Sequence, residues 1–469
     1  MSIHEAVDAP LRPEWRRAEI AVIGLARSGR AAARLLARAG CAVYASDAAV
    51  SPELEVAAAD LRAEGVAVQL GGHDLIRIAR TSLVVASPGV PPSVPAFVTA
   101  RAAGIEIVSE IEIGLRFLPD LSYLAITGTN GKTTTTSLTG HLLKALGRRA
   151  ATAGNIGTPL TELALSPTPP DWVALELSSF QLHDTPSIDP RVGVLTNLSA
   201  NHLDRYDSVE GYYGDKALMF RNASSASNWV TNADDPAVLT ITGRVAGMQN
   251  RFSVLDRGDA YYDRDAGELV VFGKPLIRRD SLQLLGDHNV ANALAATLAV
   301  MVADRAHRTG RAVEAIAGAL ATFNALEHRI ETVGEFDGVL WINDSKSTNV
   351  ASTVVAMRGM TRPTVLLLGG RHKGEPYTDL VPELHARGRA VIAYGEAGPL
   401  IEADLKGAVS VTLLRSSFEE VIGVARRLAK PGDAVLLSPA CSSYDMFDNY
   451  EQRGAVFKQM AAGVYADQT

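Results

Sequence analysis

The sequence predicts an α/β protein of three domains, each a mostly parallel sheet with flanking helices. Short runs rich in Val, Ile and Leu alternate with Ala-rich stretches along the whole chain. Runs that are apolar throughout and bounded by Gly, Asp or Pro are typical of buried parallel strands, and their alternation with helices is typical of layered α/β domains. The length of 469 residues fits about three domains of roughly 150 residues each. The expected strands cover residues 19–23, 83–86, 123–127, 172–177, 192–197, 365–368, 390–394 and 434–438.

The composition limits the classes of function. Hydrophobic residues make up 47% of the chain, which is ordinary for a globular protein and excludes disorder throughout. There are 45 Lys and Arg residues against 52 Asp and Glu residues, so the formal net charge is −7. General binders of nucleic acid or of membrane surfaces are usually basic, so we expect no nucleic-acid partner and no membrane partner.

The sequence also favours a cytoplasmic protein without membrane insertion. Its two cysteines, Cys41 and Cys441, make neither a disulfide framework nor a cysteine zinc site, and they suit a reducing cytoplasm. Apolar runs such as residues 298–303 are far shorter than the ~18–20 residues of a membrane span. Residues 1–17 contain no apolar signal core.

The first section, residues 1–104, is expected to form a Rossmann-like domain. A strand–turn–helix pattern contains Gly24 and Gly29, and Asp47 follows the next strand. These residues make half of a dinucleotide-binding fingerprint, with Asp47 at the spacing of a ribose contact, so a dinucleotide-dependent dehydrogenase is an alternative. The strand-end loop from Ser87 to Pro92 is either a ligand contact or a Pro-rich turn.

The second section, residues 105–326, is expected to form a P-loop-type domain and holds the strongest local signal. A strand leads into the turn Gly128-Thr129-Asn130-Gly131, and Lys132-Thr133-Thr134 opens a helix. Backbone N–H groups of such a turn, together with the helix N-terminus, form an anion site. Lys132 would reach the β- and γ-phosphates of ATP, and the Thr133 hydroxyl would contact Mg²⁺. The strict pattern requires glycine where Ile126 stands, so this is a variant phosphate loop; the alternative is a glycine-rich turn with a surface lysine.

Further along the same section, other polar residues follow strands or begin helices. Glu176 is a carboxylate near the end of a buried-type strand, and a buried charge is costly unless it is paired or metal-bound, so we interpret Glu176 as a magnesium ligand. His202 follows the strand at 192–197 and is either a ligand or a structural hydrogen bonder. Lys216 by itself is most simply a surface lysine. Asp287 is the expected N-cap of the helix at 289–303, whose first turn carries amides that could read an adenine or serve as simple capping polarity.

The third section, residues 327–469, is expected to form a second Rossmann-like domain. Polar clusters at 343–349, 370–374 and 438–445 each follow an expected strand, and a fourth at 327–331 precedes one. Ligands of open α/β sheets bind at the carboxyl ends of strands. The coincidence of three such clusters therefore predicts a second substrate site.

In their order along the chain, these motifs resemble those of the Mur ligases of peptidoglycan synthesis, which share their central design with folylpolyglutamate synthetase. The resemblance rests on residues 127–134, 176–182, 342–349 and 438–447 and covers the chain from Ala21 to Phe457. It implies three domains that bind the UDP of a sugar-peptide, ATP and the incoming amino acid. The implied activity is an ATP-dependent ligation of D-glutamate to UDP-N-acetylmuramoyl-L-alanine through an acyl phosphate. Another ligase of the superfamily is the alternative, although the Asp-Asn-Pro-Arg pattern expected of a diaminopimelate ligase is absent from the sequence.

The resemblance also implies roles for individual residues. Lys132, Thr133 and Glu176 match positions at ATP and a first Mg²⁺, and His202 matches a ligand of a second Mg²⁺. Lys216 matches the family's carbamylated lysine, in which a carbamate replaces the cation with a carboxylate-like metal ligand. The positions matching nucleotide contacts are Asn289, Asn292, Arg329 and Asp344. Those matching substrate contacts are Asn155, Lys346, Thr348, Lys373, Ser443, Tyr444 and Tyr450, with Ser28, Asp47 and Ser87 at the uridine and its phosphates.

The sequence departs from the family's pattern in three places. Ala200-Asn201 precedes His202 where the family often has an acidic residue. Glu375-Pro376-Tyr377 stands after Lys373 where an Asp-Phe pair is favoured, and Tyr450 replaces a common Phe. The alternative of a dinucleotide-dependent dehydrogenase is disfavoured because the matching set is intact: Lys132, Glu176, His202, Lys216 and Asp344. We expect a monomer.

Overall fold

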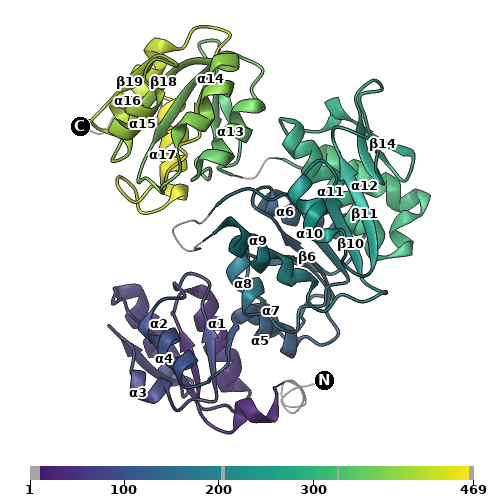
Figure 1. Ribbon diagram of the computed structural model, residues 1–469, viewed down its shortest axis with the longest axis vertical. Coiled ribbons are helices and arrows are strands. Elements are labelled where there is room, and N and C mark those ends of the chain that lie inside the picture. The colour runs from purple at the N-terminus through teal and green to yellow at the C-terminus, as the bar shows by residue number, and fades with distance from the viewer. Residues whose placement is uncertain (1–10, 202–205, 207, 325–326, 464–469) are drawn as a thin grey trace.

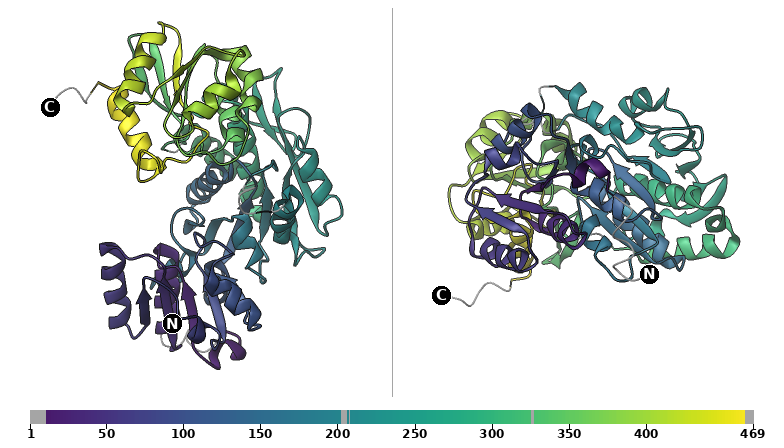
Figure 2. Two further views of the ribbon diagram at one scale, coloured as in Figure 1. Left: turned by 60° about the vertical axis from the view of Figure 1, so that its left-hand side comes forward. Right: turned by 90° about the horizontal axis from the view of Figure 1, so that it is seen from below.

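The computed structural model describes residues 11–201, 206, 208–324 and 327–463. Three α/β domains follow one another along the chain, and the central domain lies between the other two (Figures 1 and 2). His202 lies outside the described residues, so its predicted role stays a prediction. None of the helices in the described ranges combines the length and the apolar character that crossing a membrane would require.

The first domain is built on a five-stranded sheet in the order β3-β2-β1-β4-β5 with every pair parallel. β1 and β4 are buried along their whole length, as their continuous apolar sequence predicts. The strand order reverses between β1 and β4, and ligands of such sheets bind at the carboxyl ends of these strands. The strands are β1 (Ile20–Ile23), β2 (Val43–Asp47), β3 (Ala67–Leu70), β4 (Leu83–Ala86) and β5 (Ile107–Ser109); the helices are η2 (Pro13–Arg16), α1 (Arg27–Arg38), α2 (Pro52–Ala63), α3 (Leu75–Ile78) and α4 (Pro95–Ala102).

The central domain is built on a nine-stranded sheet in the order β14-β13-β12-β11-β10-β9-β6-β8-β7. Every neighbouring pair from β12 to β7 in this order is parallel, and β13 and β14 extend the sheet as an antiparallel meander. The strands are β6 (Ser122–Thr127), β7 (Ala150–Gly154), β8 (Trp172–Glu176), β9 (Val192–Leu195), β10 (Asn228–Asn232), β11 (Met248–Ser253), β12 (Ala260–Asp263), β13 (Glu268–Val271) and β14 (Lys274–Arg278).

Helices cover both faces of the central sheet and form separate apolar cores there. On one face α6 packs against α11, which places the start of α11 beside the turn that opens α6. The helices are α5 (Glu110–Phe117), α6 (Lys132–Ala145), α7 (Leu160–Ala164), α8 (Ser179–His183), α9 (Val209–Ala217), η3 (Leu218–Phe220), α10 (Pro236–Thr242), η4 (Arg279–Ser281), α11 (Asp287–Ala303), η5 (Arg305–Arg308) and α12 (Gly310–Thr322).

The third domain is built on a six-stranded sheet in the order β15-β16-β20-β17-β18-β19, in which only β15 is antiparallel. β16, β20 and β17 lie side by side, so the loops that follow them meet at one edge. The strands are β15 (Glu331–Phe336), β16 (Val339–Asn343), β17 (Thr364–Gly369), β18 (Gly388–Tyr394), β19 (Val411–Leu413) and β20 (Ala434–Leu437); the helices are α13 (Val350–Arg358), η6 (Tyr377–Leu380), α14 (Val381–Arg387), α15 (Gly398–Leu405), α16 (Phe418–Leu428) and α17 (Tyr450–Ala461).

The predicted fold class is confirmed, since each domain is a mostly parallel sheet flanked by helices. The predicted domain boundaries stay a prediction; β5, the edge strand of the first sheet, lies just beyond residue 104. The expected N-cap at Asp287 is wrong. Gly286 is the N-cap residue with φ 78°, and the Asp287 carboxylate instead pairs with Arg264 at 2.7 Å.

Candidate active site

A cleft of about 840 Å³ is lined by residues of all three domains. Pro88 and Gly89, next to the predicted contact Ser87, line it from the first domain. The predicted site residues that line it are Lys132, Asn155 and Lys216 from the central domain and Lys373 and Tyr444 from the third. The structure therefore brings residues predicted for phosphate, metal and amino-acid binding to one cavity.

The phosphate loop joins β6 to α6 through two glycines with left-handed backbone conformations. Gly128 has φ 144° and Gly131 has φ 80°. A side chain at Gly128 would collide with Thr196 Oγ1, and one at Gly131 with Asn292 Oδ1. Glycine is therefore required at both positions, both for the turn and for close packing against the neighbouring elements.

Lys132 follows this turn and folds back over it. Its Nζ donates to Gly128 O at 2.9 Å and to Thr129 O at 2.8 Å. Burial lowers the pKa of Lys132 to about 8, against the opposing effect of the Glu176 carboxylate. The cation is thus held at the mouth of the turn, where phosphate oxygens would bind.

Glu176 ends β8 and is 1% exposed. Its Oε1 accepts from Asn155 Nδ2 at 2.8 Å, whereas its Oε2 is buried and has no hydrogen-bond partner among the described residues. A buried carboxylate oxygen without a partner is unfavourable unless a cation binds it. The donor set therefore fits a divalent cation that takes few protein ligands, as Mg²⁺ does.

Lys216 lies on α9 and is also 1% exposed, so the surface position that its sequence context alone suggested is wrong. Its Nζ donates to Gly128 O at 2.7 Å and lies 4.7 Å from the centre of the Tyr212 ring. Burial, reinforced by the nearby charge of Lys132, lowers the pKa of Lys216 well below its ordinary value. Burial and the neighbouring cation therefore both favour the neutral, nucleophilic form of this amine.

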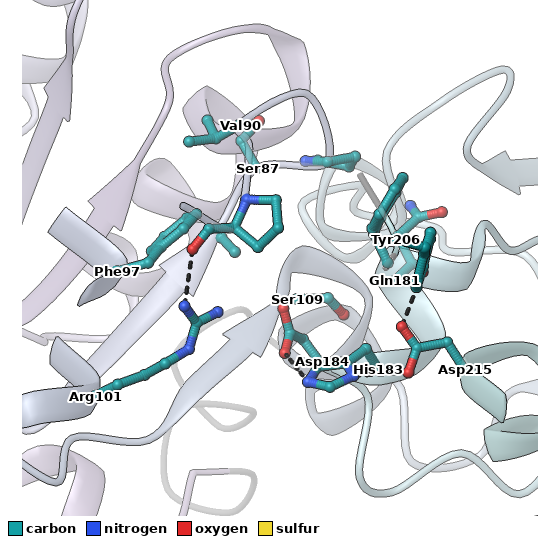
Figure 3. Close-up of a pocket in the computed structure, with 14 residues that line it drawn as sticks. Ser87, Val90, Phe97, Arg101, Ser109, Gln181, His183, Asp184, Tyr206 and Asp215 are labelled. Carbon is teal, nitrogen blue, oxygen red and sulfur yellow. Dashed lines mark hydrogen bonds and ion pairs between the residues drawn. The ribbon is translucent and has the colours of Figure 1, made fainter. Parts of the chain in front are cut away.

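A side pocket of about 340 Å³ extends between the first and central domains and is lined by Ser87 on one side and by α8 and α9 on the other (Figure 3). There Asp215, the residue before Lys216, accepts from Tyr206 OH at 2.8 Å and lies 2.9 Å from His183 Nδ1. These contacts tie α9 to α8 and to Tyr206, and so help to fix the helix that carries Lys216.

Four predicted nucleotide contacts line one small pocket with the phosphate loop: Asn289, Asn292, Arg329 and Asp344. Arg329 Nη2 donates to Thr133 Oγ1 at 3.0 Å, which links the third domain to the start of α6. Asp344 Oδ2 accepts from Ser438 Oγ at 2.7 Å, and burial raises the pKa of Asp344 to about 6. The sequence-predicted set is thus brought together from two domains.

The predicted amino-acid contacts lie on the loops after β16, β17 and β20, except Tyr450, which is the first residue of α17. Lys373 Nζ donates to Thr348 Oγ1 at 3.1 Å. Lys346 Nζ lies 5.2 Å from the centre of the Tyr450 ring, and burial lowers the pKa of Lys346 to about 8. Ser443 is buried, and its neighbours Ser442 and Tyr444 are the residues that line the cleft.

The predicted uridine-end residues lie at the carboxyl edge of the first sheet. Asp47 Oδ2 accepts from Leu25 N at 2.7 Å, so this carboxylate holds the turn after β1. Ser28 lies in the first turn of α1, and Ser87 follows β4. Beside Ser28, Arg27 reaches the central domain, where it pairs with Glu162 at 2.9 Å and donates to Gly157 O at 3.1 Å.

Arg453 organises the third-domain part of the site, and sequence reasoning missed it. This α17 side chain is completely buried and donates to Ser345 Oγ at 2.9 Å, to Ser345 O at 2.8 Å and to Cys441 O at 3.3 Å. A further bond reaches Gly369 O at 3.4 Å. One guanidinium thus joins the loops after β16 and β20 to the last residue of β17, and no local pattern around Arg453 indicates this.

A phosphate loop and buried lysines that face one cleft between three α/β domains are the arrangement expected of a nucleotide-binding enzyme. Three family models match successive parts of the chain: the Mur ligase MurD-like N-terminal domain at residues 18–109, the Mur ligase middle domain at 126–300 and the Mur ligase glutamate ligase domain at 328–441. The chain belongs to the Mur ligase family. This membership excludes the alternative of a dinucleotide-dependent dehydrogenase.

Curated relatives match along nearly their whole length. The UDP-N-acetylmuramoylalanine--D-glutamate ligase of Salinibacter ruber is 41% identical over 95% of this chain and 98% of the relative. The enzyme of the same name from Anaeromyxobacter dehalogenans is 40% identical over 96% of this chain and 98% of the relative.

Solved structures share the fold at lower identity. The UDP-N-acetylmuramate-alanine ligase MurC from Thermotoga maritima matches with a TM-score of 0.60 and 20% identity, over 96% of this chain and 100% of that one. The MurF ligase from the same organism, solved in complex with ADP, matches with a TM-score of 0.59 and 18% identity, over 90% and 96% of the two chains.

Proposed function

We propose that the protein joins D-glutamate to UDP-N-acetylmuramoyl-L-alanine, with conversion of ATP to ADP and phosphate, in the synthesis of peptidoglycan precursors. The observation that carries this proposal is the single cleft onto which Lys132, Lys216 and Lys373 converge from two domains. Full-length relatives at 41% and 40% identity, which bear the name of this ligase, support the choice of substrates.

The proposed reaction first activates a carboxylate, which has no good leaving group of its own. The alanyl carboxylate attacks the γ-phosphorus of ATP, and the bond to ADP breaks to give an acyl phosphate. The D-glutamate amine then attacks the acyl carbon, loses a proton, and phosphate leaves with the electron pair of the C–O bond. The role of Lys132 is to stabilise the phosphoryl oxygens, and the rest of the cleft chiefly positions the reactants.

Two Mg²⁺ ions fit this chemistry, with Thr133 and Glu176 as ligands of the first and His202 and Lys216 of the second. When bound, such ions neutralise charge on the phosphoryl oxygens. The partnerless Oε2 of Glu176 supports the first site. The described residues contain no group of three or more His, Cys, Asp or Glu side chains suited to hold a metal. Phosphate oxygens, water and the Lys216 carbamate would complete the coordination of the two ions.

A carbamate on Lys216 supplies the missing negative ligand. The neutral amine attacks CO₂, an N–C bond forms as one C=O π bond breaks, and one proton is released, so that the neutral amine becomes an anion. The burial of Nζ and its depressed pKa support this step because only the unprotonated amine can attack CO₂.

The proposed D-glutamate pocket is formed by Lys346, Thr348, Lys373, Ser443 and Tyr450. D-glutamate carries two carboxylates, which suit two lysines and neighbouring hydroxyls. The hydrogen bond from Lys373 to Thr348 supports a shared carboxylate site for these two side chains. Residues 1–104, 105–326 and 327–469 are proposed as the UDP-sugar, ATP and amino-acid domains of a cytoplasmic monomer, whose two cysteines are free thiols.

The test is phosphate release from ATP with and without UDP-N-acetylmuramoyl-L-alanine. D-glutamate, L-alanine, L-lysine and meso-diaminopimelate are compared as acceptors. Release that requires both the nucleotide sugar and D-glutamate is the expected result. Release with another amino acid would assign a different ligase of the superfamily, and no release with any of them would overturn the substrate pair.

A further inference from the structure

Glu375 lies two residues after Lys373, in the segment where the sequence departs from the pattern of its family. Its Oε2 accepts from Val350 N at 2.7 Å. Val350 is the first residue of α13, and the first N–H groups of a helix have no acceptor within the helix. The carboxylate therefore satisfies one of these donors and complements the positive end of the helix dipole.

This bond joins the Lys373 loop to the loop that precedes α13. Thr348 lies two residues before the helix and accepts from Lys373 Nζ at 3.1 Å. The two loops are thus linked twice, once through the proposed amino-acid contacts and once through Glu375. Glu375 is partly buried and lines the cleft.

The same first turn of α13 also contacts the phosphate loop of the central domain. Ser352 Oγ donates to Asn130 Oδ1 at 2.9 Å, and Ser352 N donates to the N-cap side chain of Asn349 at 2.8 Å. One helical turn therefore touches the amino-acid loops on one side and the phosphate loop on the other.

We propose that Glu375 and Ser352 are positioning residues that fix the amino-acid pocket relative to the phosphate loop through the first turn of α13. The inference rests on the proposed function. Glu375 holds the Lys373 loop against the start of α13 through its bond to Val350 N, and Ser352 holds α13 against the phosphate loop through its bond to Asn130. The two contacts act in series, so loss of either one breaks the connection between amine and acyl phosphate.

The test compares Glu375→Ala, Glu375→Gln and Ser352→Ala by steady-state kinetics. Glu375→Ala is expected to raise the KM for D-glutamate about tenfold, the effect of losing one hydrogen bond to a charged group, with the KM for the nucleotide sugar changed less than twofold. Glu375→Gln keeps an oxygen that can accept from Val350 N and should raise that KM by only about threefold. Acyl phosphate trapped by hydroxylamine without D-glutamate should form at the wild-type rate in Glu375→Ala.

Ser352→Ala should raise the KM for ATP as well as that for D-glutamate, because Asn130 belongs to the phosphate loop. In the double variant Glu375→Ala with Ser352→Ala, the KM for D-glutamate should be no higher than in the more affected single variant, since contacts in series are not additive. Glu420→Ala, an exposed change on α16 of the same domain, is the matched control and should leave all constants unchanged.

An unchanged KM for D-glutamate in Glu375→Ala, a parallel rise of all three KM values, or multiplicative effects in the double variant would overturn the inference. If Glu375→Ala does not fold, Glu375→Gln and Ser352→Ala still decide it. A wild-type enzyme that releases no phosphate with D-glutamate would instead contradict the proposed function, before any variant is compared.

Discussion

Lys132 and Lys216 donate to the same backbone oxygen, Gly128 O, at 2.9 and 2.7 Å. Two ammonium groups at one carbonyl repel each other, and burial disfavours both charges. The pKa of Lys132 is lowered to about 8, and that of Lys216 falls well below its ordinary value. Burial and the charge of Lys132, which is held on the turn proposed to bind phosphate, thus both favour loss of the proton from the lysine that is proposed to carry a carbamate.

Lys216→Ala is expected to lower kcat by about a hundredfold or more, because it removes a proposed ligand of the ion that stabilises the transferred phosphoryl group. Acetate or formate should restore part of the activity by replacing the lost carboxylate. Lys144→Ala, an exposed change on α6, is the control: its kcat should equal that of the wild type and should not change on addition of acetate or formate. In ¹³C-bicarbonate the wild-type enzyme should show a carbamate signal by NMR that Lys216→Ala lacks; full activity of Lys216→Ala without added carboxylate would contradict the proposal.

Glu176→Gln should lower kcat about a hundredfold and shift Mg²⁺ activation to higher concentration, since the amide keeps the side-chain shape but loses the charge. The measurement is phosphate release over a Mg²⁺ series. Glu110→Gln is a matched control, because Glu110 is also buried and also has one oxygen without a hydrogen-bond partner among the described residues, but lies on α5 and not among the residues that line the cleft. An equal loss in both variants would show that the effect is not specific to the metal site.

Glu110 itself should make stability depend on pH. Its Oε1 accepts from Thr161 N and Thr161 Oγ1, both at 2.6 Å, and burial raises its pKa from 4.5 to about 7. The folded state therefore retains a proton that the unfolded chain releases between these values, so the free energy of unfolding falls as pH rises from 4.5 to about 7.

Glu110→Gln removes this titration and should gain stability relative to the wild type between pH 5 and pH 8, by an amount on the order of 2–3 kcal/mol. Thermal unfolding of both proteins at the two pH values measures it. A difference in melting temperature that is the same at both values would mean that Glu110 does not titrate in this range.

Arg453→Met should destabilise the third domain by about 3 kcal/mol, because it leaves Ser345 and several loop carbonyls buried without their donor. The same change should raise the KM for D-glutamate, since the loops after β16 and β20 and the end of β17 lose their common contact. Arg427→Met, an exposed change on α16, is the control. Thermal unfolding and the kinetic constants test both effects. If Arg453→Met is as stable as the control, the loops keep their conformation without Arg453.

Much of the fold and part of the site could be predicted because their signals are local. The apolar run of β6, followed by Gly128, Gly131 and Lys132, predicts a strand, a turn and the start of a helix within about ten residues. Glu176 was interpretable because a lone carboxylate at the end of an apolar strand needs a partner. The sequence pattern also indicated that several polar clusters follow strands, and the order of β16, β20 and β17 makes these clusters meet.

The remaining parts depend on contacts between distant residues. Arg453 and Ser345 are 108 positions apart, and Ser352 and Asn130 are 222 apart. Neither pair leaves a periodic pattern in the sequence. The predicted N-cap of α11 was wrong by one residue, because Gly286 takes a positive φ and is the N-cap residue, while the Asp287 carboxylate pairs with Arg264. The burial of Lys216 likewise follows from packing of α9 against the phosphate loop and not from its neighbours in sequence.

Each of the three sheets is made from one uninterrupted stretch of chain, β1 to β5, β6 to β14 and β15 to β20. Domains of this kind can fold one after another as the chain leaves the ribosome. The phosphate loop is then complete while the ribosome has still to add Lys346, Lys373 and Arg453. A nascent chain can therefore form the phosphate loop before Arg329 and Asp344 exist, so the proposed nucleotide pocket and the proposed amino-acid pocket are both completed only when the last domain folds.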